Sequence, residues 1–201
     1  MLTIVLQAGG KSTRMGTDKA LLPFLGNQLI ERLKTRFSDL ADELLVITNN
    51  PDAYQSLGLP IHIDIIPERG ALGGLYTALT IASFPAVGVI AADLPFASRD
   101  LLQDLFNKLQ DSAAAAVIPC SEHGMEPLHA VYNREICLPL VLNAIKQDLW
   151  KMSSWHDQAD ILVLSPEETR KATKSEYTFW NLNTPDDLKQ AEIIAQNFDL
   201  I

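Results

Sequence analysis

The chain begins with LTIVL at residues 2–6, and the loop QAGGKSTRMGTDK at residues 7–19 follows at once. A buried strand that ends in a glycine-rich loop is typical of an open α/β sheet, in which ligands bind beyond the carboxyl ends of the strands. The glycines let a ligand approach the backbone, and Lys11, Arg14 and Lys19 add positive charge. The opening therefore predicts a phosphate cradle, and a nucleoside triphosphate fits it.

Two common phosphate loops do not match this stretch. Gly10-Lys11-Ser12 resembles the end of a Walker A loop, but that motif requires a glycine at position 5, where Val5 stands. The glycine spacing does not give G-x-G-x-x-G either. The plain alternative is a structural turn, but three glycines and three cations after a strand of buried type favour a binding loop.

Length, composition and charge narrow the class of protein. With 201 residues, of which 47% are hydrophobic, the chain can bury the core of one domain, and we expect a single domain over residues 1–201. No apolar run approaches ~18 residues and no basic leader precedes the first strand, so we expect a cytoplasmic protein that does not bind a membrane. The net charge of −9 argues against nucleic-acid binding.

The two cysteines, Cys120 and Cys137, do not have the spacing of a metal or redox motif. Two cysteines in a chain of this length fit reduced core thiols better than a disulfide framework. The histidines have no mutual spacing that suggests metal ligation, so we expect no zinc site.

Strand-like and helix-like stretches alternate along the chain. Apolar runs at residues 2–6, 43–48, 61–66, 87–92 and 114–119 predict strands, and the stretches between them are long enough for helices. Leucines at helical spacing predict helices near residues 29–37 and 101–109, and Thr184-Pro185 predicts the start of the last one. Residues 147–174 have the weakest signal, and we expect an excursion over the sheet there. The alternation predicts an α/β fold with a mostly parallel sheet.

An acid follows the fourth strand-like run. Asp93 lies in the sequence Ala92-Asp93-Leu94-Pro95, directly after residues 87–92. A carboxylate buried at a strand end is costly unless a cation pairs with it, and a hard oxygen ligand beside phosphates suits Mg²⁺. We therefore predict that Asp93 holds Mg²⁺, and the alternative is a structural aspartate that caps a helix.

A second glycine cluster begins at Gly70 and opens a helical stretch. Glycines at a helix start let a base or ribose approach the backbone, and the free amides there favour an anion or a base carbonyl. Gly70 is therefore a predicted nucleotide contact.

Taken together, these motifs resemble those of the molybdenum cofactor guanylyltransferases, which belong to a wider superfamily of sugar-phosphate and cytidylyl transferases. Residues 7–19 resemble the family signature L-A-G-G-x-S-x-R-M-G-x-D-K, with Gln7 in place of leucine. Residues 180–187, WNLNTPDD, resemble its segment F-x-N-x-N-T-P-E-D. The resemblance implies a three-layer α/β/α domain with a Rossmann-like, mostly parallel sheet of the nucleotide-diphospho-sugar transferase type.

The resemblance also implies roles for particular residues. Asp64 resembles an acid that contacts the nucleotide, either Thr48 or Asn49 falls where relatives place a nucleoside contact, and Asn183 is the second candidate ligand of Mg²⁺. We expect Asn181 to share a strand face with Asn183. The implied catalytic residues are Arg14, Lys19 and Asp93. The implied nucleotide contacts are Gln7, Ala8, Gly9, Gly10, Lys19, Thr48, Asn49, Asp64, Gly70 and Asp93.

The activity that the resemblance implies is Mg²⁺-dependent guanylyl transfer from GTP to molybdopterin, or the molybdenum cofactor, with release of pyrophosphate. Transient contacts with other proteins of molybdenum cofactor biosynthesis are implied too. Two alternatives stay open: guanylyl or cytidylyl transfer to another phosphorylated acceptor, and a nucleotide-binding accessory protein without turnover.

The acceptor side of the sequence departs from the family pattern. Glu126 stands where histidine is usual, and residues 142–151 lack the glycine found in relatives. His129 is either a substrate contact or a structural residue of an apolar strand.

Overall fold

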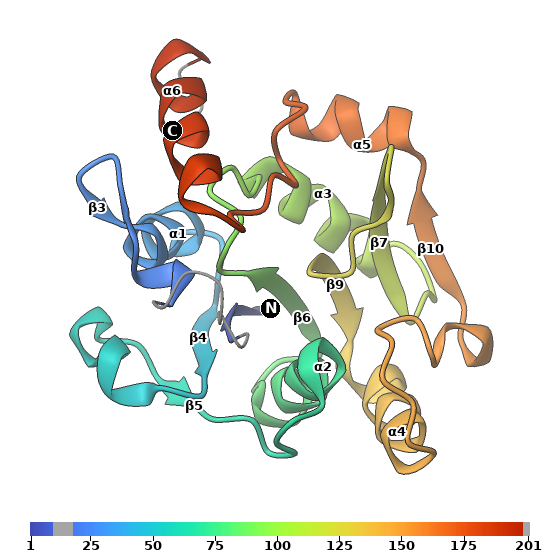
Figure 1. Cartoon of the computed structure of the whole chain (residues 1–201). Helices are drawn as coiled ribbons and strands as arrows, with labels where there is room; N and C mark the ends of the chain where they lie inside the picture. The colour runs from blue at the N-terminus through green and yellow to red at the C-terminus, as the bar shows by residue number, and fades with distance from the viewer. Residues whose placement is uncertain (10–17, 199–201) are drawn as a thin grey trace.

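The computed structural model describes residues 1–9 and 18–198. Within these ranges eight strands form one sheet in the order β10-β7-β9-β6-β1-β4-β5, with β8 paired to β7 (Figure 1). The strands of the sheet are β1 (Leu2–Ala8), β4 (Glu43–Thr48), β5 (Ile61–His62), β6 (Ala86–Ala91), β7 (Ala116–Ser121), β8 (Gly124–Met125), β9 (His129–Asn133) and β10 (Ile161–Leu164). A separate ribbon pairs β2 (Pro23–Phe24) with β3 (Asn27–Gln28).

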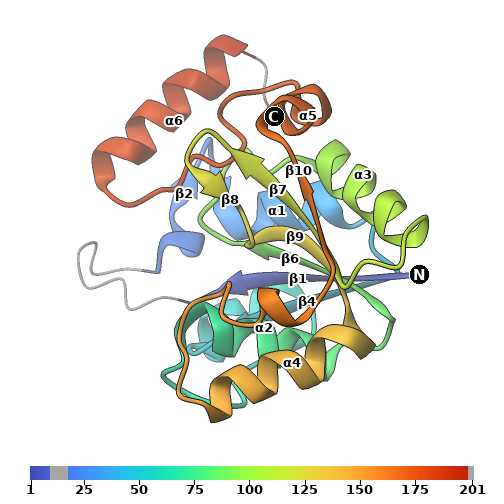
Figure 2. The same ribbon diagram turned by 90° about the vertical axis from the view of Figure 1, so that its right-hand side faces the viewer.

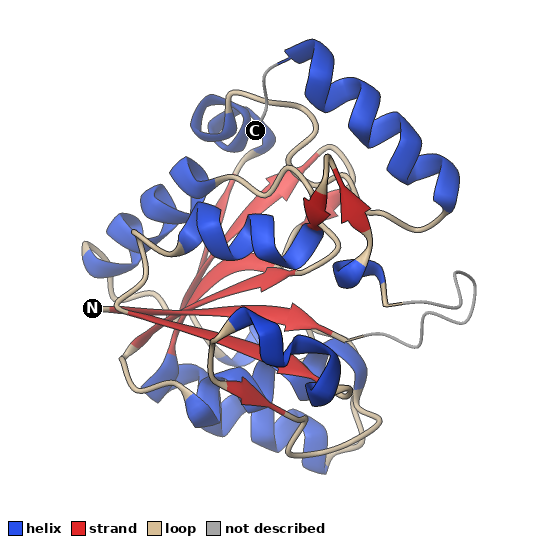
Figure 3. Ribbon diagram, turned by 90° about the vertical axis from the view of Figure 1, so that its left-hand side faces the viewer, coloured by secondary structure: helices blue, strands red, loops and turns tan. Residues whose placement is uncertain are grey.

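Most strands of the sheet run in one direction. β1 pairs in parallel with β4 and β6, β4 with β5, and β7 with β10. β9 runs antiparallel to both β6 and β7, and β8 runs antiparallel to β7. The register sets Ala8 beside Thr48, and Gln7 beside Ala91. The segments that follow β1, β4 and β6 therefore leave the sheet at the same edge, as the arrowheads in Figure 3 show.

Helices cover both faces of the sheet (Figure 2). The α-helices are α1 (Leu29–Phe37), α2 (Gly70–Ile81), α3 (Arg99–Gln110), α4 (Arg134–Lys146), α5 (Pro166–Thr173) and α6 (Pro185–Phe198). Short 3₁₀ turns are η1 (Lys19–Leu21), η2 (Pro51–Leu57) and η3 (His156–Gln158). No helix in the described ranges is both long enough and apolar enough to cross a membrane.

The core has two halves, one on each face of the sheet. Leu6 of β1 packs with buried residues of α1 and α3, whereas Val5 packs with buried residues of α2 and α4. This alternation of neighbouring side chains follows from the two-residue period of a strand. The predicted three-layer α/β/α fold is confirmed.

Local sequence explains where the predicted helices begin. Ser98 caps α3, because its side chain accepts a hydrogen bond from Leu101 N, and four leucines of this helix are buried. A capping box between Gln28 and Glu31 starts α1, whose Leu33 and Phe37 are buried. Both helices were predicted from their leucine spacing.

Two predictions of secondary structure were wrong. The run at residues 61–66 forms a strand only at Ile61–His62, which pair with Val46 and Ile47, and beyond them Ile63 is 59% exposed. Residues 147–174 are not simply an excursion, since they contain β10 and α5. β10 has only four residues, two of them exposed at the edge of the sheet, so its hydrophobic signal is weak.

Gly73 of α2 lies against backbone and a stiff part of a side chain. A Cβ atom at this position would lie 2.7 Å from Arg69 Cβ and 3.1 Å from the Ile66 carbonyl oxygen. The three atoms nearest to a Cβ at the neighbouring Gly74 all belong to the amide end of the Gln7 side chain, which can rotate away. We therefore predict that Gly73→Ala lowers the free energy of unfolding relative to Gly74→Ala by about 1–3 kcal/mol, the usual cost of overpacking.

Chemical denaturation of the two variants measures this difference. Both variants gain the same helix propensity of about 1 kcal/mol, so their comparison isolates the steric cost. Equal stability of the two variants would contradict the prediction.

Candidate active site

Two adjoining cavities lie at the carboxyl edge of β1, β4 and β6. The smaller, of about 280 Å³, reaches Lys19 and Asp93. The larger, of about 610 Å³, reaches Asn49 and Asp64. The residues common to both linings are Gln7, Ala8, Gly9, Asp18 and Gly70. The cavities therefore share one wall, and a ligand with two chemically different halves could span them.

Lys19 links three segments of the chain in the smaller cavity. Its ammonium nitrogen lies 2.9 Å from Asn183 Oδ1, to which it donates a hydrogen bond, and 3.5 Å from Asp93 Oδ2. Asp93 follows β6, Asn183 precedes α6, and Lys19 begins η1. The structure thus brings together three of the residues that the sequence singled out.

The carboxyl group of Asp93 has a perturbed pKa. Burial raises the pKa, and the nearby Lys19 ammonium opposes that rise without cancelling it. An ionised Asp93 therefore depends on a cation close by. Asp93 and Asn183 direct oxygen atoms at the same cationic nitrogen, so this donor pair fits a hard divalent cation that phosphate oxygens also bind.

Asn181 does not share this arrangement. Residues 180–183 do not form the predicted strand; instead Leu182 is fully buried and its backbone N donates to the Asp93 carbonyl oxygen at 3.0 Å. Asn181 is exposed and its side chain donates to the Phe179 carbonyl oxygen. The single backbone bond anchors the segment across the edge of the sheet, and it directs Asn183, not Asn181, to Lys19.

Asp18 is a residue of the site to which the sequence analysis gave no role. Its Oδ1 accepts a hydrogen bond from Ala20 N, which caps η1, and its Oδ2 accepts one from the Tyr54 hydroxyl at 2.5 Å. Burial, together with this carboxylate, raises the pKa of the Tyr54 hydroxyl. Asp18 thereby fixes the turn from which the Lys19 side chain extends. In the sequence, its position directly before Lys19 in the signature could have indicated that it belongs to the site.

The larger cavity brings the predicted nucleoside contacts together. Asn49 Nδ2 donates to Asp64 Oδ2 at 3.0 Å, and Asn49 is exposed. Thr48 is 1% exposed, and its hydroxyl accepts from Asn50 N within the turn. Of the two candidates, Asn49 therefore has the side chain that a ligand can reach.

Gly70 begins α2 at the wall shared by both cavities. Its φ of +55° lies in the left-handed region, which glycine adopts without steric cost. Gly70 and Ala71 thus place the start of α2, the positive end of its helix dipole, in the lining of the smaller cavity, where an anion or a carbonyl oxygen is favoured.

Three residues of the predicted cradle, Gly10, Lys11 and Arg14, lie outside the described residues. Among the described residues, no group of three or more His, Cys, Asp or Glu side chains is placed to hold a metal ion. The site therefore offers one carboxylate and one amide oxygen at the position of Lys19.

The histidine of the apolar strand is part of the core. His129 is fully buried between the rings of Phe37 and Phe179, and its Nε2 accepts a hydrogen bond from Ser98 N at 2.9 Å. Of the two predicted alternatives, the structure therefore favours the structural one. Glu126 is half-buried and accepts from the Ser121 hydroxyl at 2.7 Å, and burial raises the pKa of its carboxyl group.

The two cysteines differ in burial, since Cys120 is half-buried and Cys137 is buried. Cys120 and Cys137 are both free, and Cys137 is buried with its Sγ 3.0 Å from the Ala115 carbonyl oxygen. Burial raises the pKa of the Cys137 thiol to about 12, so this group is an inert part of the core.

The sheet with helices on both faces, together with a lysine, a carboxylate and a helix start at its carboxyl edge, defines an α/β protein of the nucleotide-binding class. Residues 4–161 match the family model described as the MobA-like NTP transferase domain. The chain belongs to this family and is an enzyme of the nucleotidyltransferase type.

Two relatives and one solved structure extend this match. The chain is 32% identical to a probable molybdenum cofactor guanylyltransferase of Carboxydothermus hydrogenoformans, with 94% of each chain covered. It is 30% identical to one of Natranaerobius thermophilus, with the same coverage. The crystal structure of molybdopterin-guanine dinucleotide biosynthesis protein A from Archaeoglobus fulgidus is similar with a TM-score of 0.84 and 27% identity, covering 98% of this chain and 100% of that one.

The buried His129 makes stability depend on pH. Burial lowers its pKa to about 4 from the ordinary value of 6.5, so the unfolded chain binds a proton that the folded chain does not. The stabilising effect of keeping this ring neutral is complete above pH 6.5 and is lost as the pH falls toward 4. The loss amounts to about 3 kcal/mol at one pKa unit per 1.36 kcal/mol.

His129→Gln keeps an acceptor for Ser98 N but cannot titrate. We predict that the wild-type protein loses more stability than this variant between pH 7 and pH 4, measured by urea denaturation at each pH. Parallel curves for the two proteins would contradict the prediction.

Proposed function

We propose that this protein catalyses Mg²⁺-dependent transfer of GMP from GTP to molybdopterin, forming molybdopterin guanine dinucleotide and pyrophosphate. The observation that carries the proposal is the Lys19 ammonium held by Asp93 and Asn183 at the carboxyl edge of the sheet. We further propose that residues 1–201 act as one nucleotidyltransferase domain.

The names of the relatives support a guanine nucleotide and molybdopterin as the two substrates. The two relatives from C. hydrogenoformans and N. thermophilus are named as probable molybdenum cofactor guanylyltransferases. The A. fulgidus structure is titled as a molybdopterin-guanine dinucleotide biosynthesis protein. If the protein makes this cofactor, we also expect transient contacts with other proteins of molybdenum cofactor biosynthesis.

In this proposal the two cavities hold different parts of GTP. The larger cavity takes the nucleoside, with Asn49, Asp64 and Gly70 as contacts. The smaller cavity takes the phosphates beside Lys19 and Asp93. The residues proposed to contact the nucleotide through the first loop are Gln7, Ala8, Gly9 and Gly10, and Arg14 joins Lys19 at the triphosphate.

Asp93 and Asn183 are the proposed ligands of Mg²⁺, which when bound neutralises charge on the phosphate oxygens. A magnesium ion in such sites is commonly held by one or two protein oxygens together with substrate phosphates, and this pair matches that pattern. The Lys19 ammonium already contacts both oxygens, so its side chain can move to the phosphate oxygens of an incoming triphosphate.

The reaction is an in-line displacement at the α-phosphorus. An oxygen of the molybdopterin phosphate forms the new bond to phosphorus, the α–β bridging bond breaks, and pyrophosphate leaves with the electron pair. A phosphate acceptor is already ionised at neutral pH, so the chain needs no nucleophilic side chain or general base. Lys19, Arg14 and the start of α2 contribute by positioning the triphosphate and by stabilising the charge that develops on it.

The acceptor side of the sequence suggests a second candidate acceptor. Glu126 is a half-buried carboxyl group in a stretch that resembles the acceptor strand of the family, so another phosphorylated acceptor would follow if molybdopterin is not the substrate.

The direct test is pyrophosphate release from GTP and from CTP, each with Mg²⁺ and with or without molybdopterin. Release from GTP that requires molybdopterin supports the proposal. Preference for CTP would replace guanylyl by cytidylyl transfer. GTP binding without pyrophosphate release in the presence of molybdopterin would contradict the proposed acceptor.

Lys19→Ala should lower kcat by about 10²-fold or more, because a charge aimed at the transition state is lost. The affinity for GTP should fall much less, since the α2 amides and the other cations still contact the phosphates. Steady-state kinetics together with calorimetric titration of GTP separate the two effects. Lys171→Ala, which removes an exposed lysine paired with Glu167, is the matched control. An unchanged kcat in Lys19→Ala would remove this residue from the site.

Asp93→Asn should abolish Mg²⁺-dependent turnover, since an amide is a much weaker ligand for a hard cation than a carboxylate. We expect a loss of about 10³-fold in kcat, with the protein still folded. Asp186→Asn, which changes an exposed carboxylate paired with Lys189, provides the control. Full activity of Asp93→Asn across a titration of MgCl₂ would contradict its proposed role.

A further inference from the structure

An exposed tryptophan borders the larger cavity. Trp150 lies in the segment after α4, and 55% of its surface is accessible. It lines the same cavity as Gly9, Asn49 and Asp64, although more than 80 residues separate it from any of them in the sequence. It does not line the smaller cavity with Lys19 and Asp93. Trp150 is therefore placed beside the nucleoside half of the site.

The Trp150 ring is held in place from one side. The guanidinium carbon of Arg69 lies over the ring, 4.7 Å from its centroid, and Arg69 also pairs with Asp148. Arg69 itself packs closely on Gly73 of α2, where any larger residue would meet its Cβ atom. The cation covers one face of the indole, so the exposed remainder of the ring is the part open to a ligand.

An open indole face suits a flat aromatic ligand. Base–aromatic stacking contributes binding free energy for every nucleobase, and the larger purine offers the larger face. The same cavity also has polar groups, the Asn49 amide and the Asp64 carboxylate, which could meet the edge of a base. Stacking on one face and hydrogen bonding at the edge together define a base site.

We propose that Trp150 stacks on the base of the bound nucleotide and favours a purine over a pyrimidine. This inference rests on the proposed function, because it takes GTP as the ligand of the larger cavity. Residues 142–151 were expected on the acceptor side, but Trp150 lines the cavity of Asn49 and Asp64 and not that of Asp93. The base, not the pterin ring of the acceptor, is therefore assigned to Trp150, since the reacting phosphate would lie beside Asp93 and the acceptor must approach that phosphate.

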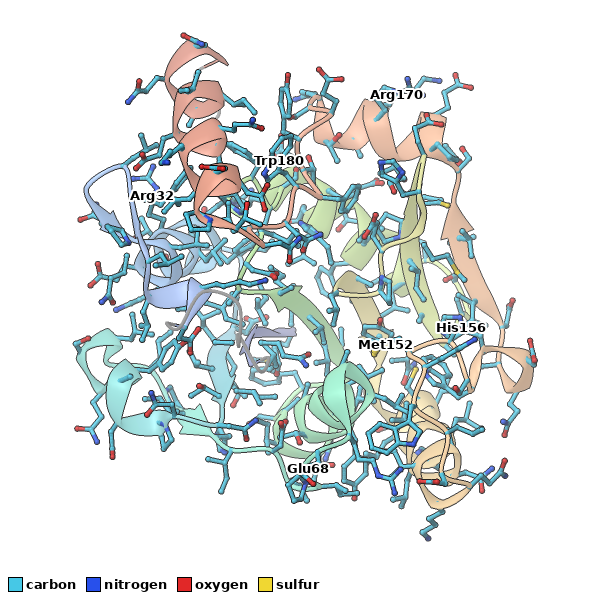
Figure 4. The ribbon with its side chains drawn as sticks, viewed as in Figure 1. Arg32, Glu68, Met152, His156, Arg170 and Trp180 are labelled. Carbon is cyan, nitrogen blue, oxygen red and sulfur yellow. The ribbon has the colours of Figure 1, made fainter. Side chains whose placement is uncertain are left out.

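Tryptophan fluorescence reports this contact directly, since the chain has three tryptophans and Trp150 is the most exposed. Trp155 is fully buried. Trp180 lies on the opposite side of the molecule from Glu68, which lines the larger cavity (Figure 4). Trp180→Phe is therefore the matched control for Trp150→Phe.

The experiment titrates GTP, CTP and molybdopterin, each with Mg²⁺, into the wild type, Trp150→Phe, Trp150→Ala and Trp180→Phe, and follows both fluorescence and heat. We expect GTP to quench the wild type and Trp180→Phe but not Trp150→Phe. Trp150→Ala should weaken GTP binding about 10-fold and CTP binding less, whereas Trp150→Phe should keep most of the GTP affinity. Thermal unfolding of each variant verifies that it is folded.

Four results would overturn the inference. GTP binding by calorimetry without a change in fluorescence would leave the proposed function standing but remove Trp150 from the base site, and so would an unchanged GTP affinity in Trp150→Ala. Quenching by molybdopterin but not by GTP would assign the ring to the acceptor. A wild-type protein that binds no GTP by calorimetry would contradict the proposed function as well.

Discussion

The contact of the Lys19 ammonium with Asp93 and Asn183 is the interaction on which the site depends. It joins the end of the first loop, the end of β6 and the start of α6, three segments far apart in the sequence. Asp93 is buried enough that its pKa is raised, so the carboxylate needs a cation at this position. In the structure, Lys19 provides that cation. Asp18 and Tyr54 in turn hold the turn that carries Lys19.

The parallel strands explain why these groups meet. β1 lies between β4 and β6, and the register sets the ends of the three strands side by side. The segments beyond them then form two cavities with a common wall, one beside a lysine and a carboxylate and the other beside an amide and an acid. This division matches a nucleotide, whose phosphates and base need different surroundings. Leu182 adds a backbone bond to Asp93 that holds the Asn183 segment against the same edge.

Much of this arrangement could be predicted from the sequence. Strand periodicity identified β1, β4 and β6, and the rule that ligands bind at the carboxyl edge of an open sheet indicated Asp93 as a site residue. The family resemblance indicated either Thr48 or Asn49. Long-range contacts could not be predicted in the same way. Tyr54 pairs with Asp18 across 36 residues, and Trp150 reaches the cavity from the segment after α4. Asn181 and Asn183 were expected on one face of a strand, but the segment is held by the backbone bond of Leu182 to Asp93 instead. The alternation of polar and apolar residues could not predict this, because it is the same in a strand and in a short extended segment.

The most direct measurement is a crystal structure with a non-hydrolysable GTP analogue and Mg²⁺. The account predicts a metal ion bound by Asp93 and Asn183, the Lys19 ammonium on phosphate oxygens, and the base in the cavity of Asn49 and Asp64. A nucleotide bound elsewhere, or one bound here with Lys19 still between Asp93 and Asn183 and no metal beside them, would contradict it.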